Sequence, residues 1–176
     1  KAQAIFKNLV GKNTRYEISA TYYYAYTEYA LRNYDNALKL FLSLENNPEY
    51  AKFVPYYIVQ IYYYKKEYEK LHPYAEKILK GNPNSPNNAE IYRILGEYYY
   101  RNKDYKKAIE NLRKYESGVK KVGRNDMYLL GISYYNTNEF ANAVQYLSKV
   151  TTNDDQMSQN AYLYIGNSYI QLKDKN

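Results

Sequence analysis

Residues 92–112 read YRILGEYYYRNKDYKKAIENL, and residues 127–147 read MYLLGISYYNTNEFANAVQYL. The second stretch repeats the pattern of the first at an offset of 35 residues. Leu95-Gly96 becomes Leu130-Gly131 and, after a further 35 residues, Ile165-Gly166. Repeats of this length are typical of chains built from stacked pairs of helices.

A second landmark gives the same period. The block YDNA at residues 34–37 recurs as YEKL at 68–71, YKKA at 105–108 and FANA at 140–143. With Ala2 set in front, the last residues of these blocks are separated by 35, 34, 37 and 35 residues. Two independent landmarks with one period predict a helical repeat array.

Each unit of the repeat has the pattern of two antiparallel helices. Apolar residues recur three and four apart, as in Tyr92, Leu95 and Tyr99, which places them on one helical face. Glycine at the Leu-Gly landmark should let two helix backbones approach closely. Asn33, Asn102-Lys103-Asp104 and Asn138-Glu139 provide polar turns between the paired helices. We predict helices at residues 1–10, 14–32, 35–46, 51–65, 68–80, 88–102, 105–119, 125–137, 140–151 and 157–173.

These landmarks resemble the signature of the tetratricopeptide repeat family: a bulky residue, Leu-Gly, Tyr, then Tyr or Phe before Ala and a large apolar residue. The third unit carries it as Tyr92, Leu95, Gly96, Tyr99, Tyr105, Ala108 and Leu112, and the fourth as Met127, Leu130, Gly131, Tyr134, Phe140, Ala143 and Leu147. The first unit departs at Ala25 and Glu28, and the second at Val59, Leu71 and Ala75. The resemblance implies an all-α superhelix, a tetratricopeptide solenoid, whose usual role is to bind proteins.

The domain organisation follows from the period. We predict a single array over residues 1–176, with a half repeat at 1–13, repeats at about 14–49, 50–86, 87–121 and 122–156, and a half repeat at 157–176. The spacing lengthens only at the linker GNPNSPNN, residues 81–88, where a domain boundary is the alternative. Lys175 stands where the other units have Tyr or Phe. We therefore expect a piece of a longer bacterial array, with a homodimer through the exposed ends as one arrangement.

The composition limits the function classes. The chain has no Cys, and its mean hydropathy is -0.81 without a run of about 18 apolar residues, so no transmembrane segment is predicted. The net charge is +7, and residues 65–124 hold the excess, with 15 Lys and Arg against 8 Asp and Glu. A basic stripe could attract a polyanion such as RNA. The alternative is a solvated surface on which opposite charges pair along the helices, and we do not expect nucleic acid as the partner.

The 28 tyrosines suggest a binding surface. Triplets such as Tyr98-Tyr99-Tyr100 cannot face the core with every ring, because consecutive helical residues point about 100° apart. The resemblance implies that the first helix of each unit lines a concave groove. The residues that this places in the groove are Tyr22, Tyr26, Tyr29, Tyr56, Gln60, Tyr63, Arg93, Glu97, Tyr100, Arg101, Tyr128, Ile132, Tyr135, Leu163 and Asn167. Such a groove would bind a protein or peptide. The alternative is that Tyr replaces Phe and Leu in packing.

Catalysis finds little support in the residues. His72 is the only histidine and precedes Pro73, where a capping or surface role is expected. The seven glycines occur singly, so no phosphate-binding loop is present, and no metal site or cofactor is predicted. We expect a protein-interaction scaffold and not an enzyme. The alternatives are a polyanion-associated repeat protein that uses residues 65–124 and a purely structural spacer or self-association module. The composition is also similar to that of tetratricopeptide proteins of the bacterial cell envelope, so the periplasm or envelope is the expected compartment and the cytoplasm the alternative.

Overall fold

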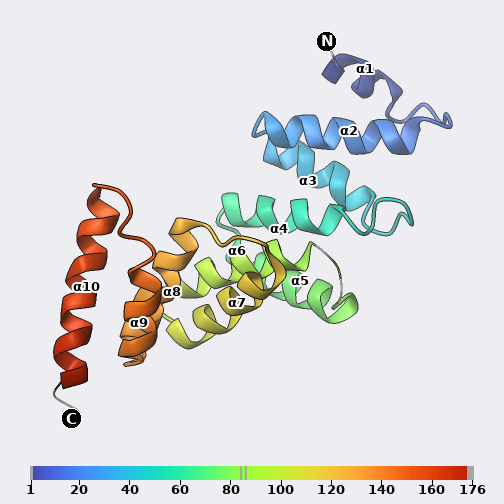
Figure 1. Ribbon diagram of the computed structural model, residues 1–176. Coiled ribbons are helices and arrows are strands. Elements are labelled where there is room, and N and C mark those ends of the chain that lie inside the picture. The colour runs from blue at the N-terminus through green and yellow to red at the C-terminus, as the bar shows by residue number, and fades with distance from the viewer. Residues whose placement is uncertain (1, 84, 86, 174–176) are drawn as a thin grey trace. The chain divides into compact units, whose positions relative to one another are not determined.

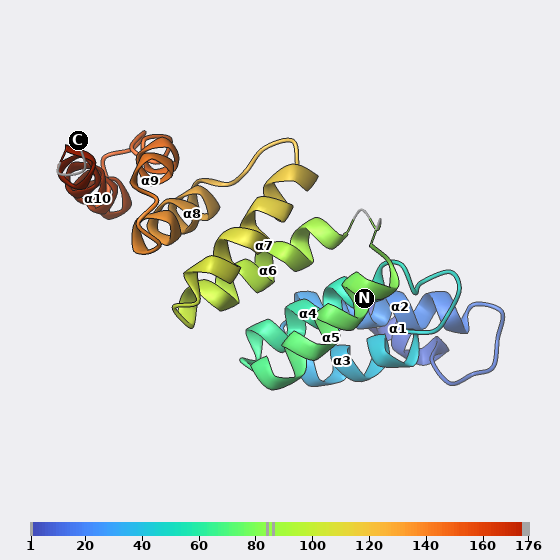
Figure 2. The same ribbon diagram turned by 90° about the horizontal axis from the view of Figure 1, so that it is seen from below.

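The computed structural model describes residues 2–83, 85 and 87–173, and in this part of the chain all regular structure is helical. Figures 1 and 2 show the helices in chain order. Their bounds are α1 (Ala2–Leu9), α2 (Glu17–Ala30), α3 (Tyr34–Ser43), α4 (Val54–Tyr64), α5 (Tyr68–Gly81), α6 (Asn88–Arg101), α7 (Tyr105–Gly118), α8 (Arg124–Asn136), α9 (Phe140–Leu147) and α10 (Gln156–Lys173). The predicted all-α helical-repeat fold is confirmed.

The predicted helix ends are wrong at several turns. The periodicity predicts helix at residues 14–16, 44–46, 51–53 and 148–151, which instead form turns. Here backbone hydrogen bonds join residues three apart instead of four. Examples are the bonds from the Leu44 amide to the Phe41 carbonyl and from the Val150 amide to the Leu147 carbonyl, both 2.9 Å. Bonds of this spacing commonly tighten or end an α-helix, and hydrophobic periodicity does not register the change.

The turn between paired helices has one geometry in all four repeats. Arg32, Lys66, Lys103 and Asn138 occupy the left-handed region, with φ of 63°, 59°, 61° and 62°. In the first repeat the Arg32 amide donates to the Tyr29 carbonyl at 2.9 Å, and the next amide donates to the Glu28 carbonyl at 2.8 Å. The same two bonds recur in the other three turns. This is the Schellman cap, in which glycine is the usual left-handed residue.

Two glycines mark close contacts between paired helices, as the sequence predicts. A Cβ at Gly96 would lie 2.6 Å from Cγ of Leu112, and one at Gly131 would lie 2.5 Å from Cγ of Leu147. Both leucines are fully buried. Only a residue without a side chain lets the α6–α7 and α8–α9 backbones come so close. Gly166 in α10 shares the sequence pattern, but a Cβ added there would meet no other atom of the described residues within 4 Å.

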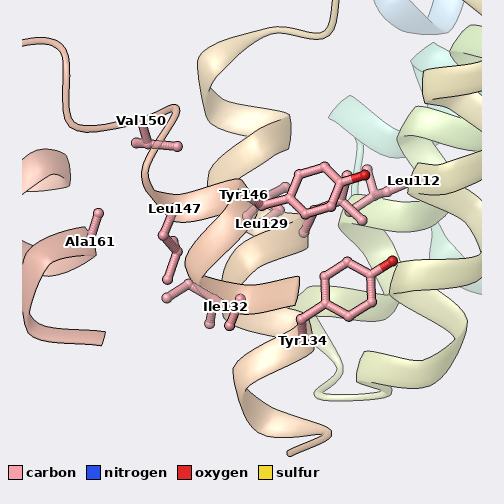
Figure 3. Close-up of a cluster of buried hydrophobic side chains, with 10 residues drawn as sticks. Leu112, Leu129, Ile132, Tyr134, Tyr146, Leu147, Val150 and Ala161 are labelled. Carbon is pink, nitrogen blue, oxygen red and sulfur yellow. The ribbon is translucent and has the colours of Figure 1, made fainter. Parts of the chain in front are cut away.

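By its internal contacts the chain divides into two compact units, residues 1–88 and 89–176. In the first unit, α1 to α5 pack in succession around fully buried residues such as Phe41, Ile58 and Leu71. In the second unit, α8 packs against α7, α9 and α10. Figure 3 shows part of this second core, where the rings of Tyr134 and Tyr146 stack with centroids 5.5 Å apart.

The linker between the units is tied to the first. The side-chain amide of Asn88 donates to the carbonyls of Asn82 at 2.8 Å and Pro83 at 2.9 Å, and the amide of Asn87 donates to the Lys52 carbonyl. The division at residue 88 coincides with the irregular linker found in the sequence. The single array and its repeat bounds remain predictions. Residues 1, 84, 86 and 174–176, including the Lys175 position, lie outside the described residues.

Candidate protein-binding face

The three tyrosines of α2 that the sequence assigns to a groove gather around one ring of α4 that it did not assign. The centroid of Tyr57 lies 6.4 Å from Tyr22, 5.9 Å from Tyr26 and 5.4 Å from Tyr29. The Tyr57 ring also stacks on the buried ring of Phe41, with centroids 4.9 Å apart and an interplanar angle of 5°. Tyr57 therefore connects the core of the first unit with the aromatic face, which consists of Tyr22, Tyr26, Tyr29, Tyr56, Tyr57 and Tyr63.

A buried amide fixes the rings of this aromatic face. Gln60 is 7% exposed; its carbonyl accepts a hydrogen bond from the Tyr29 hydroxyl, and its amide donates to the Tyr56 hydroxyl at 2.7 Å. Burial raises the pKa of Tyr29 well above its usual range, and burial with a hydrogen bond to Tyr57 does the same for Tyr22. The hydroxyls therefore stay protonated and can donate. Gln60 orients the face from within.

The aromatic face also contains accessible rings. Tyr26 is 47% exposed. Tyr63 is half-buried and lies 5.9 Å from Tyr64 and 6.4 Å from Tyr68, ring centroid to centroid. The first unit thus combines rings held by their neighbours with ring surface that water can reach.

Three of the four predicted residues of α6 in the second unit, Arg93, Glu97 and Arg101, are charged and already paired. Nε of Arg93 lies 2.7 Å from a carboxylate oxygen of Glu90, and the Arg101 guanidinium contacts Glu97 at 2.8 and 3.1 Å. Asp126, the buried acid at the start of α8, faces the same region. Burial and the charges of Glu90 and Glu97 raise its pKa, although Arg93 opposes the shift.

Farther along the second unit the predicted residues are again aromatic. Burial, together with Tyr128, Tyr105 and Tyr164, raises the pKa of Tyr100 to about 12. Tyr135 packs edge-on against Tyr164, with centroids 4.9 Å apart. The structure therefore brings Tyr100, Tyr128 and Tyr135 to the same neighbourhood, with Tyr164 of α10 among them.

The other predicted residues of this unit have different surroundings. Ile132 is 4% exposed and belongs to the core. Leu163 is 62% exposed, and Asn167 is half-buried.

The sequence analysis missed Tyr57, Tyr64 and Tyr164 as members or neighbours of these faces. Phe6 stacks on Tyr23 with centroids 5.5 Å apart, and Phe41 stacks on Tyr57 one repeat later, but these contacts are visible only in the structure.

Comparison with known proteins agrees with this architecture. Family models described as tetratricopeptide repeat match residues 59–119 and 127–156, which together are more than half of the chain. No curated protein matches the chain. Residues before 59, where Ala25 and Glu28 depart from the signature, lie outside both matched segments. With its helix pairs, glycine contacts and matched segments, the chain belongs to the tetratricopeptide repeat family.

Proposed function

We propose that this chain is a protein-interaction scaffold whose aromatic face on α2 and α4 binds a peptide segment of a partner protein. Tetratricopeptide repeats generally mediate protein–protein interaction, so the class of function follows from the family. The observation that supports this particular face is the cluster around Tyr57, in which ordered rings lie beside the 47% exposed Tyr26.

Physical chemistry favours such a surface for binding. Tyrosine provides a large contact area at a low cost in conformational entropy, and it dominates many interfaces. Here Gln60 has already fixed Tyr29 and Tyr56, so less freedom is lost when a partner binds. The hydroxyls can bond to a peptide backbone while the ring faces contact apolar side chains.

The charges give less support to a polyanion partner. Many basic side chains of residues 65–124 lie beside acids: Lys65 contacts Asp35 and Glu67, and Lys114 contacts Glu110. Ion pairs of this kind reduce the positive field that phosphate binding requires. We therefore place the partner among proteins, and an envelope assembly is the setting that the composition suggests.

A selection from a random peptide library tests the proposal. We expect peptides selected on the chain to bind Tyr26→Ala and Tyr63→Ala at least about tenfold more weakly, because aromatic anchors that a partner can reach contribute most of the energy at such surfaces. Leu42→Ala is the matched control, since Leu42 is 40% exposed on the second helix α3. Circular dichroism should show unchanged helix content. Equal affinity for the three variants and the parent chain would refute the aromatic face as the binding site.

No helix among the described residues is both long enough and apolar enough to span a membrane.

A further inference from the structure

A hollow lies at the turn between α2 and α3. One cavity of about 350 Å³ is lined by Tyr29, Ala30, Arg32, Tyr34 and Tyr64. A second, of about 380 Å³, is lined by Glu28, Arg32, Asn33, Tyr34, Asp35 and Asn36. Arg32 and Tyr34 line both, so the two cavities adjoin. Each has the size of a small-molecule site. We call the first cavity the turn pocket.

One small residue distinguishes this turn from the others. Ala30 is the last residue of α2, and the same repeat position holds Tyr64, Arg101 and Asn136 in the following repeats. A large side chain at this position would project from the helix end where the turn pocket opens. The small side chain beside the turn pocket is therefore a feature of the first repeat.

The walls of the turn pocket are ordered aromatic rings. Tyr34 and Tyr64 stack with centroids 5.5 Å apart and an interplanar angle of 18°. Tyr29 lies 6.1 Å from Tyr34 and 6.4 Å from Tyr64, and its hydroxyl is bonded to Gln60. These contacts fix the rings before any ligand arrives, which favours a flat apolar group.

Arg32 gives the turn pocket its charge. Asp35 pairs with Lys65 at 2.5 Å, and Lys65 also contacts Glu67 at 2.7 Å. Glu28 accepts hydrogen bonds from the neutral side-chain amides of Asn36 at 2.8 Å and of Gln3. The exposed Arg32 guanidinium has no ion-pair partner within the described part of the chain. The two nearby acids thus have other partners, which leaves Arg32 available for an external anion. An arginine beside aromatic rings is suited to a carboxylate attached to a flat group.

We propose that the turn pocket binds an aromatic side chain of the partner peptide together with an adjoining carboxylate, which Arg32 holds. The inference rests on the proposed function, because Tyr29 belongs both to the aromatic face and to the turn pocket. A peptide on α2 and α4 would reach the turn pocket at Tyr29. The carboxylate is either the chain terminus after a final aromatic residue or an acidic side chain next to it.

Small probes test the turn pocket without a partner. In NMR titrations of the isotope-labelled chain, 3-phenylpropionate should shift the signals of Arg32, Tyr34 and Tyr64. The neutral 3-phenylpropionamide should bind about tenfold more weakly, the ratio expected when a charge-assisted hydrogen bond is lost.

Arg32→Gln should remove the preference for the acid, and Ala30→Tyr should abolish binding of both probes by filling the turn pocket. Lys66→Gln is the matched control, since Lys66 has the same turn geometry but lines neither cavity. Equal binding of the acid and the amide, or retained selectivity in Arg32→Gln, would overturn the proposal.

Peptides separate the two sources of carboxylate and separate this proposal from the proposed function. A peptide ending in Phe with a free carboxylate is compared with an amidated peptide carrying Asp next to Phe. Loss of affinity in Arg32→Gln for either one supports the proposal and identifies its source. If the small probes bind selectively but no library peptide binds the chain, the turn pocket stands and the peptide-binding function fails. If library peptides bind without any acidic preference, the function stands and the turn pocket proposal fails.

Discussion

Three glycines at equivalent repeat positions should respond in opposite directions to one substitution. Replacing a mid-helix glycine by alanine ordinarily stabilises a helix by about 1 kcal/mol. At Gly166 the added Cβ would meet no other part of the described chain within 4 Å beyond the adjacent backbone of its own helix, so the full gain is expected. At Gly131 the Cβ would lie 2.5 Å from Cγ and 2.7 Å from Cδ2 of Leu147, with the Leu147 backbone nitrogen at 3.3 Å.

The clash at Gly131 cannot be relieved cheaply, because Leu147 is fully buried and its backbone lies behind the side chain. Overpacking of this kind costs about 1 to 3 kcal/mol. After the gain in helix propensity, Gly131→Ala should destabilise the chain by about 1 kcal/mol. The two variants should therefore differ by about 2 kcal/mol, with Gly96→Ala resembling Gly131→Ala.

Urea denaturation followed by circular dichroism measures this difference. With a slope of about 2 kcal/mol per molar urea, the midpoints of Gly131→Ala and Gly166→Ala should lie about 1 M apart. Leu147→Ala supplies an internal control: in that background the space opposite Gly131 is open, and Gly131→Ala should become stabilising by about 1 kcal/mol. If Gly131→Ala raised the midpoint as much as Gly166→Ala in the parent chain, the close α8–α9 approach would be refuted.

The turns and the ion pair at α10 give two more predictions. Lys66→Gly and Lys103→Gly should each stabilise the chain by about 1 kcal/mol, because glycine adopts φ near 60° without strain. Asn138→Gly should stabilise it less, because asparagine tolerates that conformation. Thermal denaturation measures the three gains in stability, and equal gains would contradict this expectation. Asp155 accepts two hydrogen bonds from Arg124, at 2.6 and 2.7 Å, which hold its pKa far below the usual value near 3.8. Its stabilisation is complete above that value and is lost as the pH falls below it. Asp155→Asn should therefore flatten the loss of stability in acid, and an unchanged pH profile would contradict the assignment.

The period of the sequence predicted the helices well, because it reports what every repeat must bury. Gly96 and Gly131 were identifiable as close contacts from the Leu-Gly landmark that recurs in the repeats. The helix ends were less predictable, since the three-residue hydrogen bonds of the Leu44 and Val150 amides depend on the direction in which the chain continues after the helix pair. Hydrophobic periodicity carries no information about that direction.

The candidate site was only partly predictable for a related reason. The family pattern assigns Tyr26 and Tyr29 of α2 to one face, and both rings lie against Tyr57 in the structure. It could not indicate that Tyr57 would join them, because that contact depends on how α3 inserts Phe41 beneath the ring. The periodic pattern could not predict the turn pocket, since Ala30, with only a methyl group, lines it where later repeats have larger side chains.

The contacts of Gly96 with Leu112 and of Gly131 with Leu147 have almost the same dimensions and the same 16-residue offset. The second helices α7 and α9 therefore place a leucine against the glycine of their first helices in the same way. Either helix should therefore be able to replace the other. Recombination within such a gene would then exchange the outward-facing residues of a repeat and keep the leucine–glycine contact between its two helices.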